Sequence, residues 1–441
     1  MNGLANFFTR IVNRYMPDPL VVAIVLTALT VLFAMFSEGT SFLDATRYWG
    51  DGFWNLLAFT MQMTVILLAG YILAKTPLVD WLLNQLVMRI HTPRGAIIAA
   101  TLIGGIGSWL NWGFGLVVGV LIAQKLGRHV KGLHYPLVMA AGYSGFALYG
   151  VGLSGSVPLL INTPGHFLEA TIGLVPLSET IFSPVMIITC LLVIATLPFF
   201  NAMLHPKNPA DIMEAKPAEV TPQAAPPSEA ATLADRMNNS PIIGIGVGLF
   251  GMFYCALYLW GGGGITLNFI NFLFVFLGIL LFVTPNRFLV ALNDGVRIVS
   301  GIIIQYPFYA GILAILAGSG LIVTFSSWFV SISSAATLPI WSFISSGLIN
   351  IFVPSGGGQW VIQGPVMMSA AQELGASIPA TALAVQIGDQ WTNMIQPFWL
   401  LPALAISGLK LRDIMGYMVL ILFYLGVIFG SAVLIWGAIS A

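Results

Sequence analysis

Long apolar runs separated by short polar stretches dominate the chain. A membrane-spanning helix needs about 20 consecutive apolar residues, and about ten segments approach that length. We expect full spans at 19–36, 53–74, 136–153, 184–204, 241–260, 265–284, 296–317, 338–353, 393–407 and 414–436. The pattern therefore predicts an all-α polytopic membrane protein.

Further apolar segments are short, or are broken by glycine and proline: 95–107, 108–124, 320–336, 354–371 and 378–388. Lipid offers no hydrogen-bond partners, so irregular backbone at membrane depth must be buried in protein or line a wet cavity. Short broken segments beside full spans are typical of re-entrant hairpins and discontinuous helices. We expect both features here.

The domain organisation follows from one stretch that differs in kind. Residues 205–240 are rich in proline, alanine and charge, which predicts a hydrophilic linker. It separates a first membrane repeat, 19–204, from a second, 241–441. The motif AQKLG at 123–127 recurs as AQELG at 371–375, an offset that favours a duplicated architecture. If the repeats are inverted, their broken segments should meet near the bilayer midplane.

The N-terminal segment 1–18 has an amphipathic pattern. Apolar residues recur at helical spacing, while Arg10 and Arg14 lie off that stripe; the stripe is formed by Leu4, Phe8, Ile11 and Tyr15. Such a segment is expected to lie as a helix on the membrane surface, and its arginines indicate the cytoplasmic face.

Composition narrows the function classes. Hydrophobic residues make up 58% of the chain and charged residues 7%, with a formal net charge of zero and a mean hydropathy of +0.93. These values exclude a soluble enzyme and a nucleic-acid binder and leave the lipid bilayer as the partner of most of the surface. Cys190 and Cys255 lie in apolar runs without ligand spacing, so neither a metal site nor a cofactor is predicted.

Polar residues concentrate at the broken segments. After Pro354, consecutive glycines permit a tight turn with exposed amides, and a half-helix beginning there directs its positive dipole end into a cavity. This arrangement suits a small anion, although glycine and serine could instead serve close helix packing. The candidate binding residues are Ser108, Asn111, Ser154, Ser156, Ser355, Gly356, Gly357, Gly358, Gln359, Thr392, Asn393 and Gln396.

Asp389 is the clearest acidic residue inside an apolar segment. An unpaired carboxylate in a membrane is costly, so it is a functional candidate for ion coupling. It could carry a proton or bind Na⁺, and it could also cap a half-helix. No lysine or arginine lies between Arg297 and Lys410, which favours a small monoanion over a di- or tricarboxylate as the anion bound by the C-terminal half.

A hydrolase is the main alternative of another class. The sequence around Ser154, GLSG, is similar to the serine motif of intramembrane proteases, but a serine nucleophile needs a base within hydrogen-bond reach. Only His166 is near in sequence. We therefore expect no enzyme activity, and we keep a serine hydrolase and a passive channel as the alternatives.

Several motifs closely resemble the bacterial short-chain fatty acid transporter family, of the AtoE type associated with acetoacetate and butyrate uptake. They are MPDPL (16–20), WGDGFWNLLAFTMQM (49–63), NWGFGLVVG (111–119), GSVPLL (155–160), VPSGGGQWVIQGP (353–365), NMIQPFWLLPALAI (393–406) and RDIMGY (412–417). The resemblance covers nearly the whole chain outside the linker.

The resemblance implies a multi-pass secondary transporter of the bacterial inner membrane that imports small monocarboxylates by H⁺ or Na⁺ symport with alternating access. That family is similar to a wider group of ion transporters with inverted repeats, re-entrant hairpins and often a homodimeric assembly. In that group polar hairpin tips bind substrate and ion, often with a Ser-Asn-Thr triplet, which this sequence lacks at its broken segments. A carrier of di- or tricarboxylates, or of other organic anions, stays open as an alternative.

Overall fold

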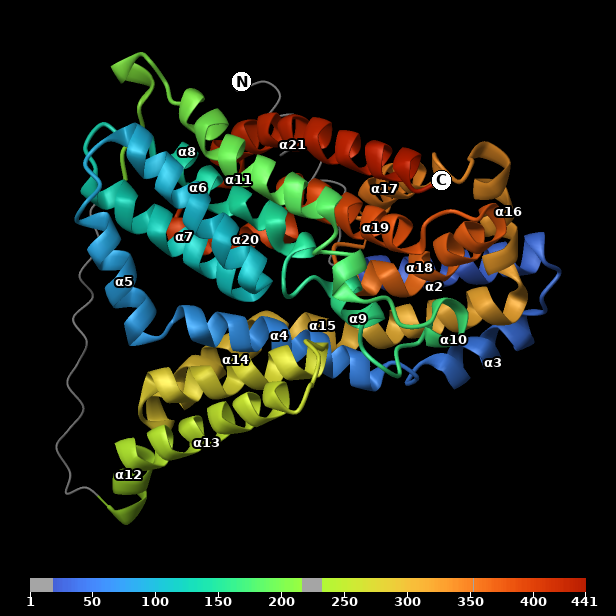
Figure 1. The fold of residues 1–441 in the computed structure, drawn as a ribbon, viewed down its shortest axis with the longest axis horizontal. Coiled ribbons are helices and arrows are strands. Elements are labelled where there is room, and N and C mark those ends of the chain that lie inside the picture. The colour runs from blue at the N-terminus through green and yellow to red at the C-terminus, as the bar shows by residue number, and fades with distance from the viewer. Residues whose placement is uncertain (1–18, 216–231, 352) are drawn as a thin grey trace.

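The computed structural model describes residues 19–215, 232–351 and 353–441, and within these residues the regular secondary structure is entirely helical (Figure 1). Seven helical segments of the described residues are long and apolar enough to cross a membrane. They are Leu20–Ser37, Leu57–Ala74, Tyr135–Ile161, Pro184–Met203, Pro241–Trp260, Val299–Ser319 and Leu411–Ile439. The predicted surface helix 1–18 and residues 216–231 of the predicted linker lie outside the described residues.

The described residues of the first half form ten α-helices and two short 3₁₀ helices. They are α2 (Pro19–Ser37), α3 (Phe42–Gly52), α4 (Leu57–Ala74), α5 (Pro77–Val87), α6 (Pro93–Leu110), α7 (Trp112–His129), α8 (Tyr135–Ser144), η1 (Gly145–Val151), α9 (Ser156–Ile161), α10 (Glu169–Ile172), η2 (Leu177–Glu179) and α11 (Pro184–Met203) among the described residues.

The described residues after α11 form a second series of helices. They are η3 (Pro209–Asp211), α12 (Leu233–Asn238), α13 (Pro241–Trp260), α14 (Leu267–Phe282), α15 (Pro285–Ser319), α16 (Leu321–Ile332), α17 (Leu338–Ile349), α18 (Gly356–Leu374), α19 (Ile378–Thr392), η4 (Asn393–Ile395), α20 (Pro397–Ser407) and α21 (Leu411–Ile439).

Three of the predicted spans are wrong in extent, and one of them, 265–284, forms α14, of 16 residues, which is not among the seven. The other two are shorter still: 338–353 forms only α17, of 12 residues, and 393–407 forms η4 and then α20, of 11 residues. Proline explains both limits, because it disfavours helical geometry in the residue before it and lacks an amide hydrogen. Gln396, just before Pro397, is extended, and Pro354 prevents α17 from continuing into α18. By contrast, 95–107 and 108–124 extend into helices of 18 residues each, α6 and α7.

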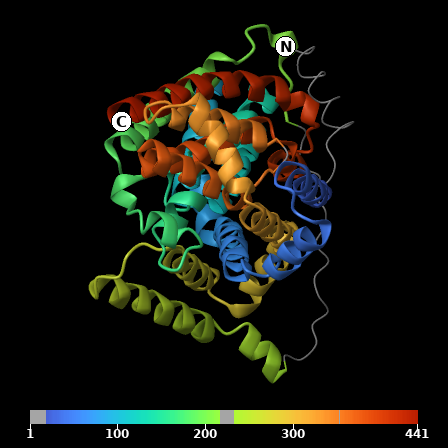
Figure 2. The same ribbon diagram turned by 90° about the vertical axis from the view of Figure 1, so that its right-hand side faces the viewer.

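The helices form two groups, which the views in Figures 1 and 2 separate. A central group contains α6–α9, α11 and α17–α21, and a peripheral group contains α2–α4 and α13–α15. The groups meet where α4 packs on α7 and where α15 packs on α18. The site described below lies along this second contact.

Both halves repeat one order of elements. The pair α6–α7 is followed by a helix interrupted after η1, and the pair α17–α18 is followed by a helix interrupted at η4. The motif at 123–127 lies at the end of α7, and its copy at 371–375 lies at the end of α18. This order agrees with a duplicated architecture, and the inverted orientation of the repeats stays a prediction.

The first residues of the predicted linker are held against the central group. The Tyr135 amide donates to the Met213 carbonyl at 2.7 Å, and the Met213 amide donates to His134 Nδ1 at 3.0 Å. The Gly132 amide donates to Glu214 Oε1 at 2.7 Å. Burial, and then His205, lowers the pKa of His134 below its usual value, while Asp211 acts in the opposite direction. Residues 211–214 are therefore part of the folded unit.

Candidate functional site

The two interrupted helices lie against each other where η1 packs on α19. The Gly150 amide donates to Gln390 Oε1 at 2.7 Å, and the Val157 amide donates to Gln386 Oε1 at 3.0 Å. Both glutamines are fully buried in α19. They supply the hydrogen bonds that the backbone loses at the break, as membrane depth requires.

Asp389 lies on α19 between these two glutamines and is only 1% exposed. Its Oδ2 accepts a hydrogen bond from the Tyr149 hydroxyl and another from Asn393 Nδ2 at 3.3 Å. Among the described residues, its Oδ1 has no hydrogen-bond partner, and no lysine, arginine or histidine forms a salt bridge with the carboxylate. A buried, uncompensated carboxylate costs free energy, which a bound proton or cation would reduce.

The glycine-rich turn forms the N-terminus of α18. Ser355 caps this helix by accepting the Gly358 amide at 3.3 Å, and its Oγ lies 2.8 Å from the Tyr306 hydroxyl of α15. The amides of Gly356 and Gly357 form no hydrogen bond with the described residues. The 19-residue helix thus begins with free donors at its positive dipole end, an arrangement that binds anions.

Gly356 brings this turn into contact with the buried carboxylate. A Cβ atom at Gly356 would lie 2.9 Å from the Tyr149 hydroxyl and 3.1 Å from Asp389 Oδ2. Such distances are too short for an added carbon atom without a shift of these groups, so glycine permits the close approach. The structure therefore joins η1 of the first half with α18 and α19 of the second.

A small cavity of about 10 Å³ lies at this junction, with room for about one water molecule. The interrupted helices α8–α9 and α19–α20, together with α7, contribute Trp112, Phe146, Tyr149, Ser156 and Trp399 to its wall. The remaining lining residues come from α15 and from the start of α18, and they are Tyr306, Ser355, Gly356 and Gly357. Of the predicted binding residues, Ser156, Ser355, Gly356 and Gly357 thus line one space.

Three other predicted residues gather around Asn350, just behind Asp389. Asn350 Nδ2 lies 2.9 Å from the Asp389 carbonyl, 2.9 Å from Thr392 Oγ1 and 2.8 Å from Asn393 Oδ1. Gln396 Nε2 donates to the Asn350 carbonyl at 2.9 Å. This cluster joins the end of α17 to the break after α19, so it positions the carboxylate helix without lining the cavity.

Three predicted binding residues of the first half lie around the junction between α6 and α7. Asn111 caps α7 by accepting the Phe114 amide at 2.9 Å, and Ser154 Oγ accepts the Trp112 amide at 2.7 Å. Ser108 is fully buried, and its Oγ has no described hydrogen-bond partner. These three residues do not line the cavity, and their predicted role in binding stays a prediction.

Gly358 and Gln359 follow the lining residues directly on α18 but do not line the cavity. Gln359 Nε2 donates to Ser346 Oγ at 2.6 Å and to Gln363 Oε1 at 2.8 Å, which ties α18 to α17. A Cβ atom at Gly358 would lie 2.5 Å from the Tyr309 ring, so this glycine permits α18 to pack on α15.

Sequence reasoning missed several members of the site: Tyr149, Tyr306, Asn350, Gln386 and Gln390. A signal existed for the two glutamines, because positions 386, 389 and 390 share one face of an otherwise apolar helix. The tyrosines carried no such signal, since they are brought to the site from other helices by packing.

The serine-hydrolase alternative has no geometric support among the described residues. Ser154 Oγ accepts a backbone amide, and both ring nitrogens of His166 are engaged elsewhere. His166 Nε2 lies 3.0 Å from the Gly173 carbonyl, and Nδ1 accepts the Leu168 amide at 3.3 Å. The serine and the histidine therefore do not form a nucleophile–base pair.

Known proteins share this fold and sequence. One solved structure, the Alcanivorax borkumensis YdaH transporter, described as having an unusual topology, matches with a TM-score of 0.62 over 95% of this chain and 98% of its own, at 16% identity. That likeness concerns the fold alone.

Two relatives have names that assign them provisionally to short-chain fatty acid transport. One, from Escherichia coli (strain K12), is 42% identical over 97% of this chain and 98% of its own length. The other, from Haemophilus influenzae (strain ATCC 51907 / DSM 11121 / KW20 / Rd), is 38% identical over the same shares. Residues 1–436 also match the short chain fatty acid transporter family, and the chain therefore belongs to that family of multi-pass membrane transporters.

Proposed function

We propose that the protein imports short-chain fatty acids, such as butyrate or acetoacetate, across a bacterial inner membrane by H⁺ or Na⁺ symport. The observation that carries this proposal is the contact between Asp389 and the glycine turn at the start of α18. It places a group able to take up a coupling ion beside free amides able to bind an anion.

The substrate carboxylate is assigned to the amides of Gly356 and Gly357, with the hydroxyls of Ser355 and Ser156 as further donors. The aromatic walls of the cavity, Trp112 and Trp399, suit a short alkyl chain. Dipoles and hydroxyls without a cation hold a monoanion more readily than a di- or tricarboxylate, whose second charge would remain uncompensated.

Coupling is assigned to Asp389. In the ionised form its charge is buried and has only neutral hydrogen-bond donors, Tyr149 and Asn393. A proton or Na⁺ taken up together with the substrate removes this cost, so the ion and the anion favour each other's binding through a linked equilibrium. This mutual dependence is what symport requires.

The state described here is closed around the site. A cavity of about 10 Å³ has room for a water molecule but not for a four-carbon acid, so the walls must separate for binding. We assign this opening to movement between the central and peripheral groups, because Tyr306 of α15 touches Ser355 of α18 across their contact. This movement would expose the site alternately to the two sides of the membrane.

Transport in proteoliposomes tests the proposal. Labelled butyrate should accumulate when an inward pH or Na⁺ gradient is imposed, and unlabelled acetoacetate should compete, whereas succinate and citrate should not. If neither gradient drives the accumulation of any monocarboxylate, symport is rejected. Efficient competition by citrate would favour the carrier of larger organic anions.

The Asp389→Asn variant tests the coupling role. It keeps the shape of the side chain but cannot take up a proton as a carboxylate does. Gradient-driven uptake should fall at least tenfold, while exchange of labelled for unlabelled butyrate at equal pH should persist. An unchanged response to the gradient would exclude Asp389 as the coupling group.

We also propose that the protein forms a homodimer. Light scattering during size-exclusion chromatography would test this assembly.

A further inference from the structure

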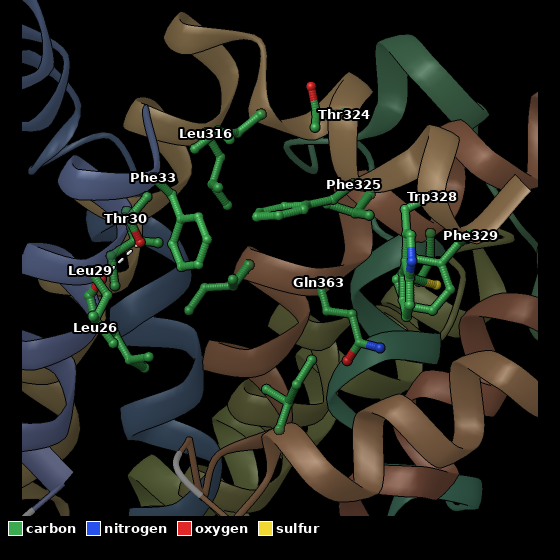
Figure 3. Close-up of a pocket in the computed structure, with 16 residues that line it drawn as sticks. Leu26, Leu29, Thr30, Phe33, Leu316, Thr324, Phe325, Trp328, Phe329 and Gln363 are labelled. Carbon is green, nitrogen blue, oxygen red and sulfur yellow. Dashed lines mark hydrogen bonds between the residues drawn. The ribbon is translucent and has the colours of Figure 1, made fainter. Parts of the chain in front are cut away.

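A second and much larger cavity, of about 610 Å³, lies apart from the site (Figure 3). Four helices enclose most of it: α2 and α15 of the peripheral group, then α16 and α18. Phe33 of α2 and Phe325 of α16 meet across it with ring centroids 6.2 Å apart. Its volume lies in the range of about 300–1,000 Å³ that is typical of small-molecule sites.

Apart from the indole N–H of Trp328, the polar side chains in the wall of this cavity are engaged with neighbouring described residues. Thr30 donates to the Leu26 carbonyl at 2.8 Å, and Thr324 donates to Glu38 Oε1 at 2.7 Å. The amide of Gln363 is engaged on both sides, because Nε2 donates to Ser345 at 3.0 Å and Oε1 accepts from Gln359 at 2.8 Å. Water needs two to four polar partners, so this cavity is suited to an apolar occupant.

The position of the cavity identifies the occupant. Helix α2 has 19 residues, a length of about 28 Å that matches the hydrocarbon layer of about 30 Å. The cavity is lined by residues 26–33, the middle of this helix. Leu29 is 44% exposed, Phe33 55% and Trp328 58%, so these mouth residues face outward at the depth of the lipid tails.

We propose that the cavity binds one acyl chain of a membrane phospholipid, which enters between α2 and α16 and lies against α18. The abundant apolar molecules at this depth are lipid tails, and the absence of charge along the described wall leaves no partner for a carboxylate. The chain would contact Ile362, while the same helix presents the Ser355–Gly356 turn at its N-terminus. The bound lipid therefore touches the helix that carries the transport site.

Photo-crosslinking of the full-length protein in nanodiscs tests this assignment. The probe is a phosphatidylethanolamine with a diazirine at the middle of one acyl chain, and labelled residues are mapped by mass spectrometry. We expect labelling of Ile362 and Met367, of which Met367 is only 1% exposed, because both line the cavity. Labelling restricted to outward-facing residues such as Leu29 and Trp328 would overturn the proposal.

A matched pair of variants sharpens the test. Leu29→Trp places a larger ring at the mouth and should reduce the labelling of Ile362 at least fivefold. Ile24→Trp is the control, because Ile24 is 47% exposed but points about 140° away around the same helix; it should leave the labelling unchanged. Equal labelling in both variants would contradict an acyl-chain site with this entrance.

A filling variant and a competitor complete the test. Ile362→Phe occupies the cavity from α18 and should lower labelling of Met367, while labelling of Phe253 on the exposed side of α13 reports normal folding and lipid contact. Loss of labelling on adding millimolar butyrate would instead place the cavity on the substrate route and overturn the lipid assignment. None of these readouts depends on transport, so a failed transport proposal would leave the result interpretable.

Discussion

The two cavities described above share one helix but differ in size and chemistry. The cavity at the start of α18 measures about 10 Å³, and the one beside its middle about 610 Å³. Three polar groups at or near the small cavity have no partner among the described residues, namely the Gly356 and Gly357 amides and, behind them, Asp389 Oδ1. At the large cavity Thr30, Thr324 and Gln363 are engaged with neighbouring residues.

The difference suggests a rule for our proposed site: it is identified by unmet hydrogen bonds and not by volume. Buried polar atoms are nearly always paired in proteins, so a group of unpaired ones indicates a missing ligand. A large apolar space indicates a different kind of ligand, one without charge. The following predictions test whether the two spaces really differ in this way.

Gly356→Ala should have the largest effect. The added methyl group would lie within 3.1 Å of Asp389 Oδ2 and closer still to the Tyr149 hydroxyl, and overpacking of this kind costs about 1–3 kcal/mol. Butyrate uptake should fall about 10- to 100-fold. Gly246→Ala is the control, since a methyl group there meets no atom within 4 Å. Equal uptake by both variants in proteoliposomes would refute the close contact.

Tyr149→Phe should have an intermediate effect. The change removes the hydroxyl that donates to Asp389, and a hydrogen bond to a charged group contributes about 1.5–3 kcal/mol. The pH at which uptake is half-maximal should shift, and the maximal rate should fall about tenfold. Tyr254→Phe serves as the control, because Tyr254 is 49% exposed on α13. An unaltered pH profile in the Tyr149 variant would count against its contact with the coupling group.

Leu29→Trp should have little effect on transport itself. Its side chain faces the large cavity and contacts none of the polar atoms at the small one. The concentration of butyrate at half-maximal uptake should stay within about twofold of the unmodified protein, since a surface substitution typically changes free energies by about 0.5 kcal/mol or less. A tenfold change would mean that the two cavities belong to one binding site.

The smallest effect is expected far from both cavities, at the contact between His134 and Met213. The lowered pKa of His134 means that the folded chain favours the neutral ring, whose Nδ1 accepts the Met213 amide. This stabilisation is present above the unfolded value of about 6.5 and is lost as the pH falls below it. Hydrogen exchange at Met213, corrected for intrinsic rates, should be about threefold faster at pH 5.5 than at pH 7.5, corresponding to less than about 1 kcal/mol.

Two variants test whether the pH dependence of hydrogen exchange at Met213 comes from His134. In the His134→Ala variant the Met213 amide should exchange rapidly at both pH values, because the ring nitrogen that accepts its hydrogen bond is missing. His91→Ala should retain the pH dependence of the unmodified protein. Identical rates at both pH values in the unmodified protein would show that the ring nitrogen does not hold this segment.

Much of the fold could be predicted because the bilayer imposes a simple rule on sequence. Runs such as 184–204 and 414–436 correspond closely to α11 and α21, since a spanning helix must be long and apolar. The short helices were less predictable. An apolar run such as 338–353 has the composition of a full span, but α17 ends at Ile349, and the side chain of the next residue, Asn350, bonds to the end of α19.

The candidate site was predictable in part. Glycines after Pro354 and a lone aspartate in an apolar segment are unusual in a membrane protein, so Gly356 and Asp389 could be selected from sequence. Tyr149 and Asn350 could not, because tyrosine and asparagine also occur at many positions without function. Their importance comes from hydrogen bonds to residues 240 and 39 positions away.

The sequence by itself determined that this chain spans a membrane, where its longest helices run and which residues are too polar for their surroundings, because these follow from the cost of placing polar groups in lipid. The tertiary structure alone decided which of these residues meet. It placed Gly356 against Asp389 and Tyr149, and it directed Ser154 and Gln359 to backbone and helix contacts instead. Contacts between distant segments depend on how whole helices pack, and no local pattern along the chain records that.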